Sequence, residues 1–228
     1  MNRRLECLYQ LLPVDGHGII DVGTDHAQIP IQLAENGYKG NLFASDIAEG
    51  PLRTAHMAAR SHQVEERIHF LNCDGLELCP PDAVDTILIA GMGGDTICGI
   101  LDRAEWVFDG DYLLVLQPMT HAEVLRYWLV HNGYRIDLEA VIADSGQVYQ
   151  IFTARLGKSS TYTDTEYLTG LRETARAGDP PFLLQKREKK RLEKIRDGLQ
   201  KAGKGNSAEA LFYKKILLDM EEAKNADH

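Results

Sequence analysis

Several polar residues follow one short apolar run near the N-terminus, and their types could do chemistry on a bound ligand. Residues 18–27 read GIIDVGTDHA, which places Asp21, Gly23, Asp25 and His26 within six positions. Gly23 permits a tight turn and a close approach to a ligand. The Asp21 carboxylate could bind a ligand's ammonium or cap the turn. The Asp25 carboxylate could stabilise positive charge developing in a substrate, or cap the next helix, and His26 could bind substrate or simply pack.

Acidic residues also follow the next two apolar runs of the chain. Asp46 and Ile47 come after residues 41–45, about 25 positions beyond Asp21. An acid at this place typically binds ribose hydroxyls, since two oxygen acceptors suit a cis-diol. Asp74 and Gly75 come after residues 68–72. Asp74 could accept from an adenine amino group while Gly75 leaves room for the ring, although Asp-Gly is also a common turn.

Two later runs end in a glycine cluster and in an amide. Residues 86–90 are followed by Gly91, Met92, Gly93 and Gly94, a composition that leaves backbone amides open to a ligand. The run 112–117 ends in Gln117, whose side-chain amide could bond a purine edge. Four residues further on, His121 could cap the following helix.

A parallel sheet would bring these residues together. The sequence predicts strands at 18–22, 41–45, 68–72, 86–90, 112–117, 135–141 and 148–154. It predicts helices between them at 29–36, 51–62, 96–104 and 122–132. This alternation favours βαβ units, whose ligands bind outside the carboxyl ends of the strands. The last two strands are joined by only a few residues, so we expect them to form an antiparallel hairpin.

The two ends of the chain predict additional helices. Leucines at helical spacing over residues 5–12 indicate an N-terminal packing helix. Residues 158–181 read as a linker, with a short helix expected at Glu166–Arg176. Two amphipathic stretches, 182–201 and 208–224, are separated by a glycine-rich break. They predict an antiparallel helical hairpin that resembles a coiled-coil arm.

Composition and charge narrow the class of protein. The 228 residues are 44% hydrophobic with a net charge of −9, and no apolar run approaches the ~20 residues of a membrane span. Four cysteines without a Cys-x-x-Cys pair disfavour disulfides and a zinc site and fit a reducing cytosol, and Glu6 interrupts any signal peptide. Residues 183–205 nevertheless hold nine Lys and Arg against three acids. This basic segment on an acidic body hints at RNA or another anionic partner, unless it is only a solvated helix face.

The motifs together resemble those of the bacterial tRNA (adenine-22-N1)-methyltransferases over nearly the whole chain. The matching strings are DVGTDHA at 21–27 followed by Pro30, Gly50-Pro51, DGL at 74–76, IAGMGG at 89–94, LQP at 116–118 and PFL at 181–183. One departure is Ala44-Ser45-Asp46, where members of the family often have Ala-Gly-Glu. The resemblance implies a class I S-adenosyl-L-methionine (SAM) methyltransferase fold. In this fold a Rossmann-like, mostly parallel sheet has an antiparallel C-terminal hairpin.

The resemblance also implies an organisation and a set of functional residues. It assigns 1–157 to the methyltransferase domain, 158–181 to a linker and 182–228 to a helical arm that binds tRNA. The implied catalytic residue is Asp25. The implied contacts to SAM are Asp21, Gly23, Asp46, Ile47, Asp74, Gly75 and Gly91. The implied substrate contacts are His26, Met92, Gly93, Gln117, Lys189, Lys190 and Arg191. A cytoplasmic enzyme is expected, with no metal, no membrane contact and no obligate protein partner.

The glycine cluster bears on which nitrogen is methylated. Methyltransferases that act on exocyclic amines usually carry Asn/Asp-Pro-Pro-Tyr/Phe at this place, and here residues 91–94 are Gly-Met-Gly-Gly. That absence favours a ring nitrogen.

Two alternatives remain open from the sequence. A dinucleotide-dependent oxidoreductase would need a glycine at Thr96 and an acid after the strand that begins at Tyr112, and the chain has neither. A non-catalytic, methyltransferase-like RNA-binding protein would carry the same motifs.

Overall fold

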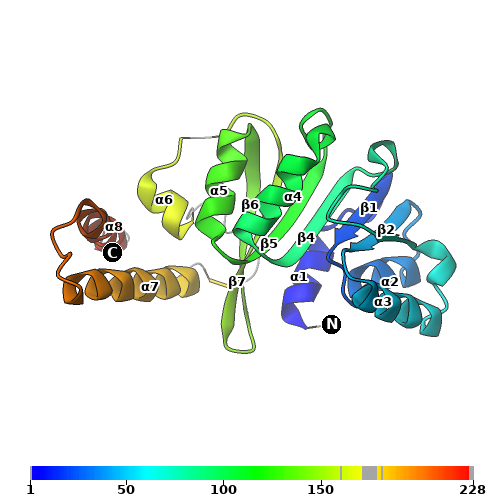
Figure 1. The fold of residues 1–228 in the computed structure, drawn as a ribbon, viewed down its shortest axis with the longest axis horizontal. Coiled ribbons are helices and arrows are strands. Elements are labelled where there is room, and N and C mark those ends of the chain that lie inside the picture. Colours follow the sequence, from blue (N-terminus) through cyan, green and yellow to red (C-terminus); the bar gives the residue numbers. More distant parts are fainter. Residues whose placement is uncertain (1, 160, 171–178, 181, 226–228) are drawn as a thin grey trace.

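The computed structural model describes residues 2–159, 161–170, 179–180 and 182–225. A sheet with helices on both faces forms the body, and a helical arm extends from one end of it (Figure 1). The sheet has seven strands in the order β3-β2-β1-β4-β5-β7-β6. Their bounds are β1 Gly18–Val22, β2 Asn41–Asp46, β3 His69–Asn72, β4 Thr86–Gly93, β5 Leu113–Thr120, β6 Tyr134–Asp144 and β7 Gln147–Leu156.

The strand directions confirm the predicted fold class. The strands β1 to β5 pair in parallel with one another, and β7 pairs antiparallel with both β5 and β6. All five residues of β1 are buried, as expected for a central strand covered on both faces. This arrangement brings the carboxyl ends of β1, β2, β4 and β5 to one edge of the sheet.

The glycine cluster differs from the sequence expectation. Strands β4 and β5 each continue three residues past their predicted ends, and Met92 pairs with Pro118 while Gly93 pairs with Thr120. The register shifts between Ala90 and Met92, because Gly91 adopts a φ of +82° and bulges out of the ladder. Residues 91–93 are therefore strand rather than loop.

Two apolar cores lie on opposite faces of the sheet. Helices α4 (Gly94–Arg103) and α5 (Ala122–His131) cover one face with Ile97, Leu101 and Leu125. Helices α1 (Arg3–Leu11), α2 (Gln28–Glu35) and α3 (Glu49–Ser61) supply Leu8 and Ile31, among others, to the core of the second face. The expected N-terminal packing helix is therefore confirmed as α1. In the described part of the chain, no helix has the length and apolar character of a membrane span.

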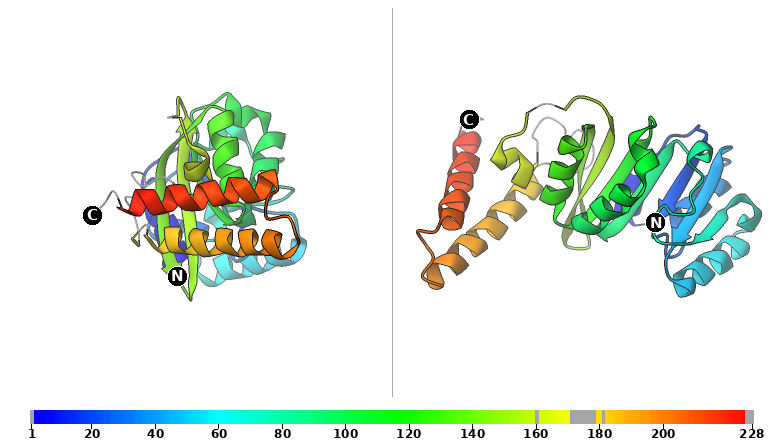
Figure 2. Two further views of the ribbon diagram at one scale, coloured as in Figure 1. Left: turned by 90° about the vertical axis from the view of Figure 1, so that its left-hand side faces the viewer. Right: turned by 45° about the horizontal axis from the view of Figure 1, so that its top comes forward.

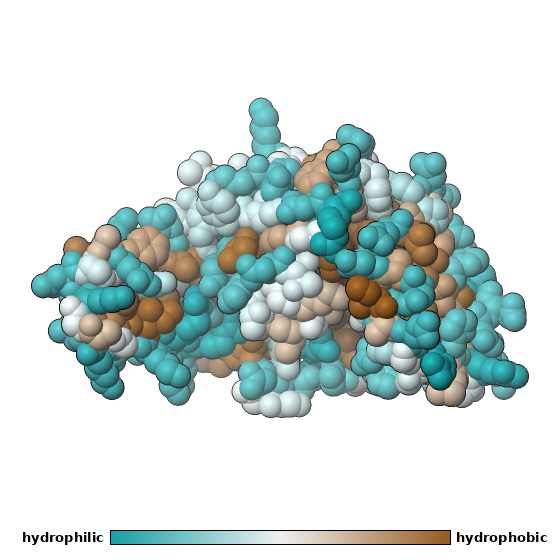
Figure 3. Space-filling view, viewed as in Figure 1, coloured by the Kyte–Doolittle hydropathy of each residue, from teal (hydrophilic) through white to brown (hydrophobic). Residues whose placement is uncertain are grey.

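The C-terminal helices form the arm. Helices α7 (Phe182–Lys201) and α8 (Ala208–Asn225) lie antiparallel, which is clearest in Figure 2. Their contact is built by Leu192, Ile216 and Leu217, with Leu168 of helix α6 packed against them. Figure 3 shows hydrophilic side chains over most of the visible surface, with apolar ones emerging beside the arm helices.

The expected linker contains a helix that anchors the arm. Helix α6 runs from Asp164 to Thr169, begins with a capping box and stops at Gly170, whose φ is +88°. It is thus shorter than the predicted helix at 166–176, of which residues 171–176 lie outside the described residues. The buried Arg126 of α5 donates to the backbone carbonyl of Tyr167 in α6 and to Glu139 in β6, so α6 is tied to the body.

Candidate active site

The carboxyl ends of β1 and β4 meet at the centre of the sheet edge. Gly23 ends the first strand with a φ of +70°, and a Cβ atom there would overlap the terminal methyl group of Met92. Gly23 is favoured by its backbone conformation, and any larger residue there would also have to displace the flexible end of the Met92 side chain. The contact brings together two of the residues that the sequence singled out.

Asp21 lies under the Gly23 turn. Its side chain is buried, with 8% of the residue exposed, and Oδ2 accepts a 2.7 Å hydrogen bond from Thr24 Oγ1. Burial raises the pKa of Asp21 to about 6, a rise that the Thr24 bond opposes and the charge of Asp46 increases. The described residues give this carboxylate no cationic partner, so a bound cation nearby would stabilise its ionised form.

Asp25 projects from the same turn into solvent. Helix α2 has Ala27 at its N-cap and no side-chain cap, so Asp25 does not serve as the helix cap that the sequence left open. Both Asp25 and Ala27 have a φ of +50°, a costly conformation for residues other than glycine. Asp25 Oδ2 lies 3.6 Å from His26 Nε2, and both side chains are more than half exposed. The turn thus holds an acceptor at the site's opening.

The end of β2 presents one acceptor and one apolar side chain. Asp46 Oδ1 accepts from the Ala48 amide at 2.9 Å, and its second carboxylate oxygen makes no hydrogen bond with the described residues. Asn72 Nδ2 donates to the carbonyls of Asp46 and Ile47 at 3.0 and 3.2 Å and so fixes this turn. Ile47 is 70% exposed. This arrangement fits a nucleoside. The free oxygen of Asp46 can accept from the ribose hydroxyls, and the exposed side chain of Ile47 can contact the base.

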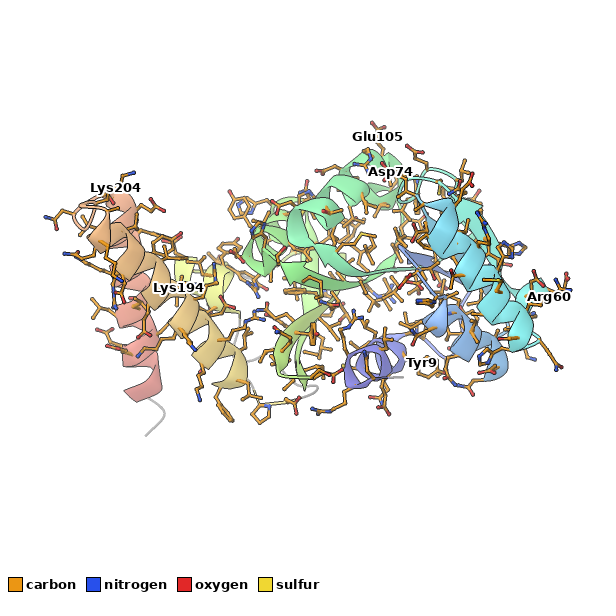
Figure 4. All side chains as sticks on the ribbon, turned by 60° about the horizontal axis from the view of Figure 1, so that its bottom comes forward. Tyr9, Arg60, Asp74, Glu105, Lys194 and Lys204 are labelled. Atoms are coloured by element: carbon orange, nitrogen blue, oxygen red, sulfur yellow. The ribbon has the colours of Figure 1, made fainter. Side chains whose placement is uncertain are left out.

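Asp74 is engaged elsewhere in this structure. Its Oδ1 accepts from Arg103 Nη2 at 2.9 Å, and both side chains are about half exposed. Gly75 has a φ of +61°, and a Cβ on it would lie 2.8 Å from Ile100 Cγ2. Figure 4 places Asp74 on the body, far from Lys194 and Lys204 of the arm. Because exposed ion pairs are weak, a ligand could compete for the Asp74 carboxylate.

Gln117 is already hydrogen-bonded within the protein. It is fully buried, its Oε1 accepts from Arg4 Nη1 at 2.6 Å, and its Nε2 donates to the Pro118 carbonyl at 2.9 Å. The structure therefore offers no free amide at Gln117 for a purine edge, because the residue is used to hold Arg4. That arginine also lies beside Gly91, with Nη1 3.8 Å from where a Cβ on Gly91 would be.

Arg4 lies at the edge of the site, and the sequence motifs did not include it. The sequence did offer one indication of its role. A cation in the first turn of a helix is disfavoured by the helix dipole, so an arginine at that position suggests a function other than stabilising the helix.

His121 also differs from expectation. It occupies the N-cap of α5 with a φ of +54°, yet its side chain makes no cap bond and instead pairs with Asp95 of α4. This hydrogen bond and the Asp95 charge raise the pKa of His121. The pair lies next to Gly93 and Gly94, and a Cβ on Gly93 would lie 3.1 Å from Thr120 Oγ1. The His121–Asp95 pair therefore borders the glycine cluster.

The three cations predicted to contact tRNA lie on α7 and differ in whether the protein already pairs them with an acid. Lys189 pairs with Glu221 of α8 at 2.8 Å. Arg191 pairs with Glu188 at 2.6 Å and with Glu123 of α5 at 3.3 Å, and so fastens the arm to the body. Lys190 is exposed and forms no ion pair with the described residues. In this structure it alone of the three presents an unpaired charge to an outside partner.

Comparisons with known proteins agree with this geometry. The curated tRNA (adenine(22)-N(1))-methyltransferase of Bacillus subtilis (strain 168) is 29% identical over 200 residues, which cover 88% of this chain and 82% of the relative. These comparisons confirm the resemblance drawn from the motifs.

No group of three or more His, Cys, Asp and Glu side chains that could hold a metal occurs among the described residues.

Solved structures match along the whole chain, arm included. Streptococcus pneumoniae Sp1610 in complex with SAM is 26% identical with a TM-score of 0.80, over 95% of this chain and 99% of that one. An uncharacterised Listeria monocytogenes protein is 27% identical with a TM-score of 0.83, over 97% and 98%. The methyltransferase domain family matches residues 1–152, and the chain belongs to that family.

Proposed function

We propose that this chain is a SAM-dependent tRNA methyltransferase that modifies N1 of the adenine at position 22. The observation that carries the proposal is the position of the Asp25 carboxylate. It is exposed beside the Gly23–Met92 contact and is not used to cap helix α2. The activity of the Bacillus subtilis relative supports the choice of substrate. Family membership favours this function over the dinucleotide oxidoreductase.

The residues at the strand ends fit SAM. When bound, SAM supplies a methyl group on a sulfonium centre. The unbonded oxygen of Asp46 suits the ribose hydroxyls, and exposed Ile47 suits a face of the adenine. Buried Asp21 lacks a cation and suits the positive end of the amino-acid moiety, either directly or through the turn amides. Asp74 reaches the adenine amino group only if it releases Arg103.

Asp25 would act by electrostatics rather than as a base. The N1 atom of neutral adenine carries an in-plane lone pair, so no proton has to leave before the methyl group arrives. The adenine becomes cationic during the transfer, and an acceptor beside it stabilises that charge. A carboxylate at the site's opening can also accept a hydrogen bond from the exocyclic amine. The small residues Gly91 and Gly93 leave space for the base beside Met92.

The arm would position the RNA. Position 22 lies inside folded tRNA, so the base has to be extruded to reach the site. The exposed lysines of α7, namely Lys186, Lys190, Lys194 and Lys201, supply charge that can meet phosphates. The tRNA substrate would be met in the cytoplasm. The arm and the strand ends would then act on one ligand from two sides.

Methyl transfer to defined tRNA transcripts tests the proposal. We expect labelled methyl groups from SAM to enter a transcript with adenine at position 22, and a reverse-transcription stop to map them there. A transcript with guanine at position 22 should stay unlabelled. Tight binding of SAM and tRNA without transfer would support the non-catalytic alternative. Transfer to protein, or to another nucleotide, would contradict the assignment.

A further inference from the structure

We propose that Arg4 is an anion-binding residue of the active site, which takes a carboxylate or phosphate group of a ligand seated beside Gly91. This inference rests on the proposed function, because it assumes that a ligand with such a group enters the site. It concerns a residue outside the motifs that led to the function.

The position of the guanidinium is the first argument. Arg4 belongs to α1, yet its side chain reaches the carboxyl end of β4, where Nη1 comes within 3.8 Å of a Cβ position on Gly91. Its Cζ also lies 5.6 Å from the centre of the Tyr149 ring on β7. Gly91 is exposed and has no side chain, so the space in front of the guanidinium is open to a ligand.

The unbalanced charge is the second argument. Two other arginines that reach across the body are neutralised by acids, Arg3 by Asp179 and Arg126 by Glu139, whereas Arg67 donates to the carbonyl of Tyr38. Arg4 instead meets the neutral amide of Gln117, and no carboxylate of the described residues forms an ion pair with its side chain. A guanidinium offers five N–H donors, and the Gln117 bond uses one. The remaining donors and the whole charge are available to an anion.

The support beneath Arg4 is the third argument. Gln117 is fully buried, and its Nε2 bond to the Pro118 carbonyl fixes which end of the amide faces Arg4. Arg4 itself belongs to the first turn of α1, where the helix dipole disfavours cations, and its side chain carries the charge across to Gln117. A buried amide that orients an unpaired arginine is the kind of support expected beneath a binding residue.

Two parts of the proposed complex carry a suitable anion. The amino-acid end of SAM has a carboxylate, and the RNA has phosphates on either side of the target adenine. Both would be bound by paired N–H donors of the guanidinium. Binding measurements separate these two sources without depending on methyl transfer.

The tests use Arg4→Gln and Gln117→Glu, with Arg60→Gln as the control. Gln117→Glu keeps the size of the side chain and gives Arg4 an internal counter-charge, although it loses the bond that Nε2 donates to the Pro118 carbonyl. The two variants thus remove the unpaired charge of Arg4 in different ways. Arg60 lies exposed on α3, at the end of the body that is opposite the arm in Figure 4. Circular dichroism and thermal unfolding check that each variant folds, and Arg4→Lys, which keeps the charge but loses the paired donors, provides a second route if one does not.

If Arg4 takes the cofactor carboxylate, calorimetry should show S-adenosylhomocysteine binding about 10-fold weaker in both variants, close to the cost of one charge-assisted hydrogen bond. Binding of 5′-methylthioadenosine, which lacks the amino-acid end, should not change. If Arg4 takes a phosphate, S-adenosylhomocysteine affinity should hold. The slope of log Kd for tRNA against log salt should then fall by about 0.7 to 0.9.

Unchanged affinity for both ligands in folded Arg4→Gln and Gln117→Glu would overturn the role of Arg4 while leaving the proposed function intact. A wild-type protein that binds neither ligand would overturn both.

Discussion

The first strand end of the sheet and the C-terminal arm differ in how their key charges are paired. At the end of β1, Asp21 is buried without a cation, and among the described residues Asp25 has only the neighbouring His26 within ion-pair distance. In the arm, by contrast, Lys189 and Arg191 are paired with acids of the protein itself. A rigid sheet can hold a few charges unpaired for a ligand, whereas a thin helical hairpin uses many of its charges to hold itself together. Net charge is therefore a poor guide to which arm residues contact RNA.

Replacing Asp25 should have the largest effect at the strand ends. We expect Asp25→Asn to lower kcat by about 10²–10³-fold, the usual result of removing one group that stabilises transition-state charge. Affinity for S-adenosylhomocysteine should stay the same, because the side chain points into solvent rather than under the turn. Single-turnover methylation of tRNA, with calorimetry alongside, measures both. His26→Gln is the neighbouring control, and an equal loss of kcat there would argue against a distinct role for Asp25.

The Gly23 turn gives the next largest effect. Gly23→Ala should lower the free energy of unfolding by about 1 kcal/mol more than Gly37→Ala, because the end of the Met92 side chain must move in addition to the backbone strain that both variants share. Gly37 is a matched control, since its φ is also positive, at +78°, and nothing lies within 4 Å of its Cβ position. Urea denaturation measures the difference. Met92→Ala in the Gly23→Ala background should restore part of the loss, and no restoration would mean that the Met92 contact is unimportant.

Asp21 should show a trade of stability for function. Its pKa is raised from 3.8 to about 6 in the folded protein, so the folded protein binds this proton more tightly than the unfolded chain does. That preference stabilises the fold below pH 4 and is lost as the pH rises through 6. Asp21→Asn should therefore be more stable than wild type above pH 6 by about 1–2 kcal/mol, since two pKa units correspond to roughly 3 kcal/mol and a weaker Thr24 bond offsets some of it.

Urea titrations at pH 4.5 and 7.5 test this prediction for Asp21. The advantage of the variant should be small at the lower pH and full at the higher one, while its affinity for SAM should be weaker at pH 7.5. A variant that is no more stable at pH 7.5 would show that the Asp21 charge is compensated in the apo protein.

The sequence predicted the sheet and the strand ends on which the candidate site residues lie, and the points where it differs from the structure have physical causes. Strand β1 was predicted to its first and last residue, because its apolar run is followed directly by Gly23, whose φ of +70° ends the strand. The fourth strand was predicted to end at residue 90, because the glycine density of residues 91–93 hides an extension that pairs with β5. Gln117 has a suitable side chain but is bonded to Arg4, and Arg191 pairs with Glu123 of α5. Such long-range partners leave no local pattern, whereas the second partner of Arg191, Glu188, lies at the i,i+3 spacing of helical ion pairs and could have been found from the sequence.

The smallest effects are expected in the arm, and two adjacent lysines make the sharpest test there. Lys190→Gln should weaken tRNA binding a few-fold and lower the salt slope by about 0.7 to 0.9, because an unpaired charge can release counterions from a phosphate. Lys189→Gln should change binding less, since its ammonium already lies 2.8 Å from Glu221. Glu221→Gln should then tighten tRNA binding by freeing Lys189. Filter binding over a range of salt concentrations measures all three. Equal effects at the two lysines would mean that RNA outcompetes the internal pairs, and the contrast between arm and strand ends would then disappear in the complex.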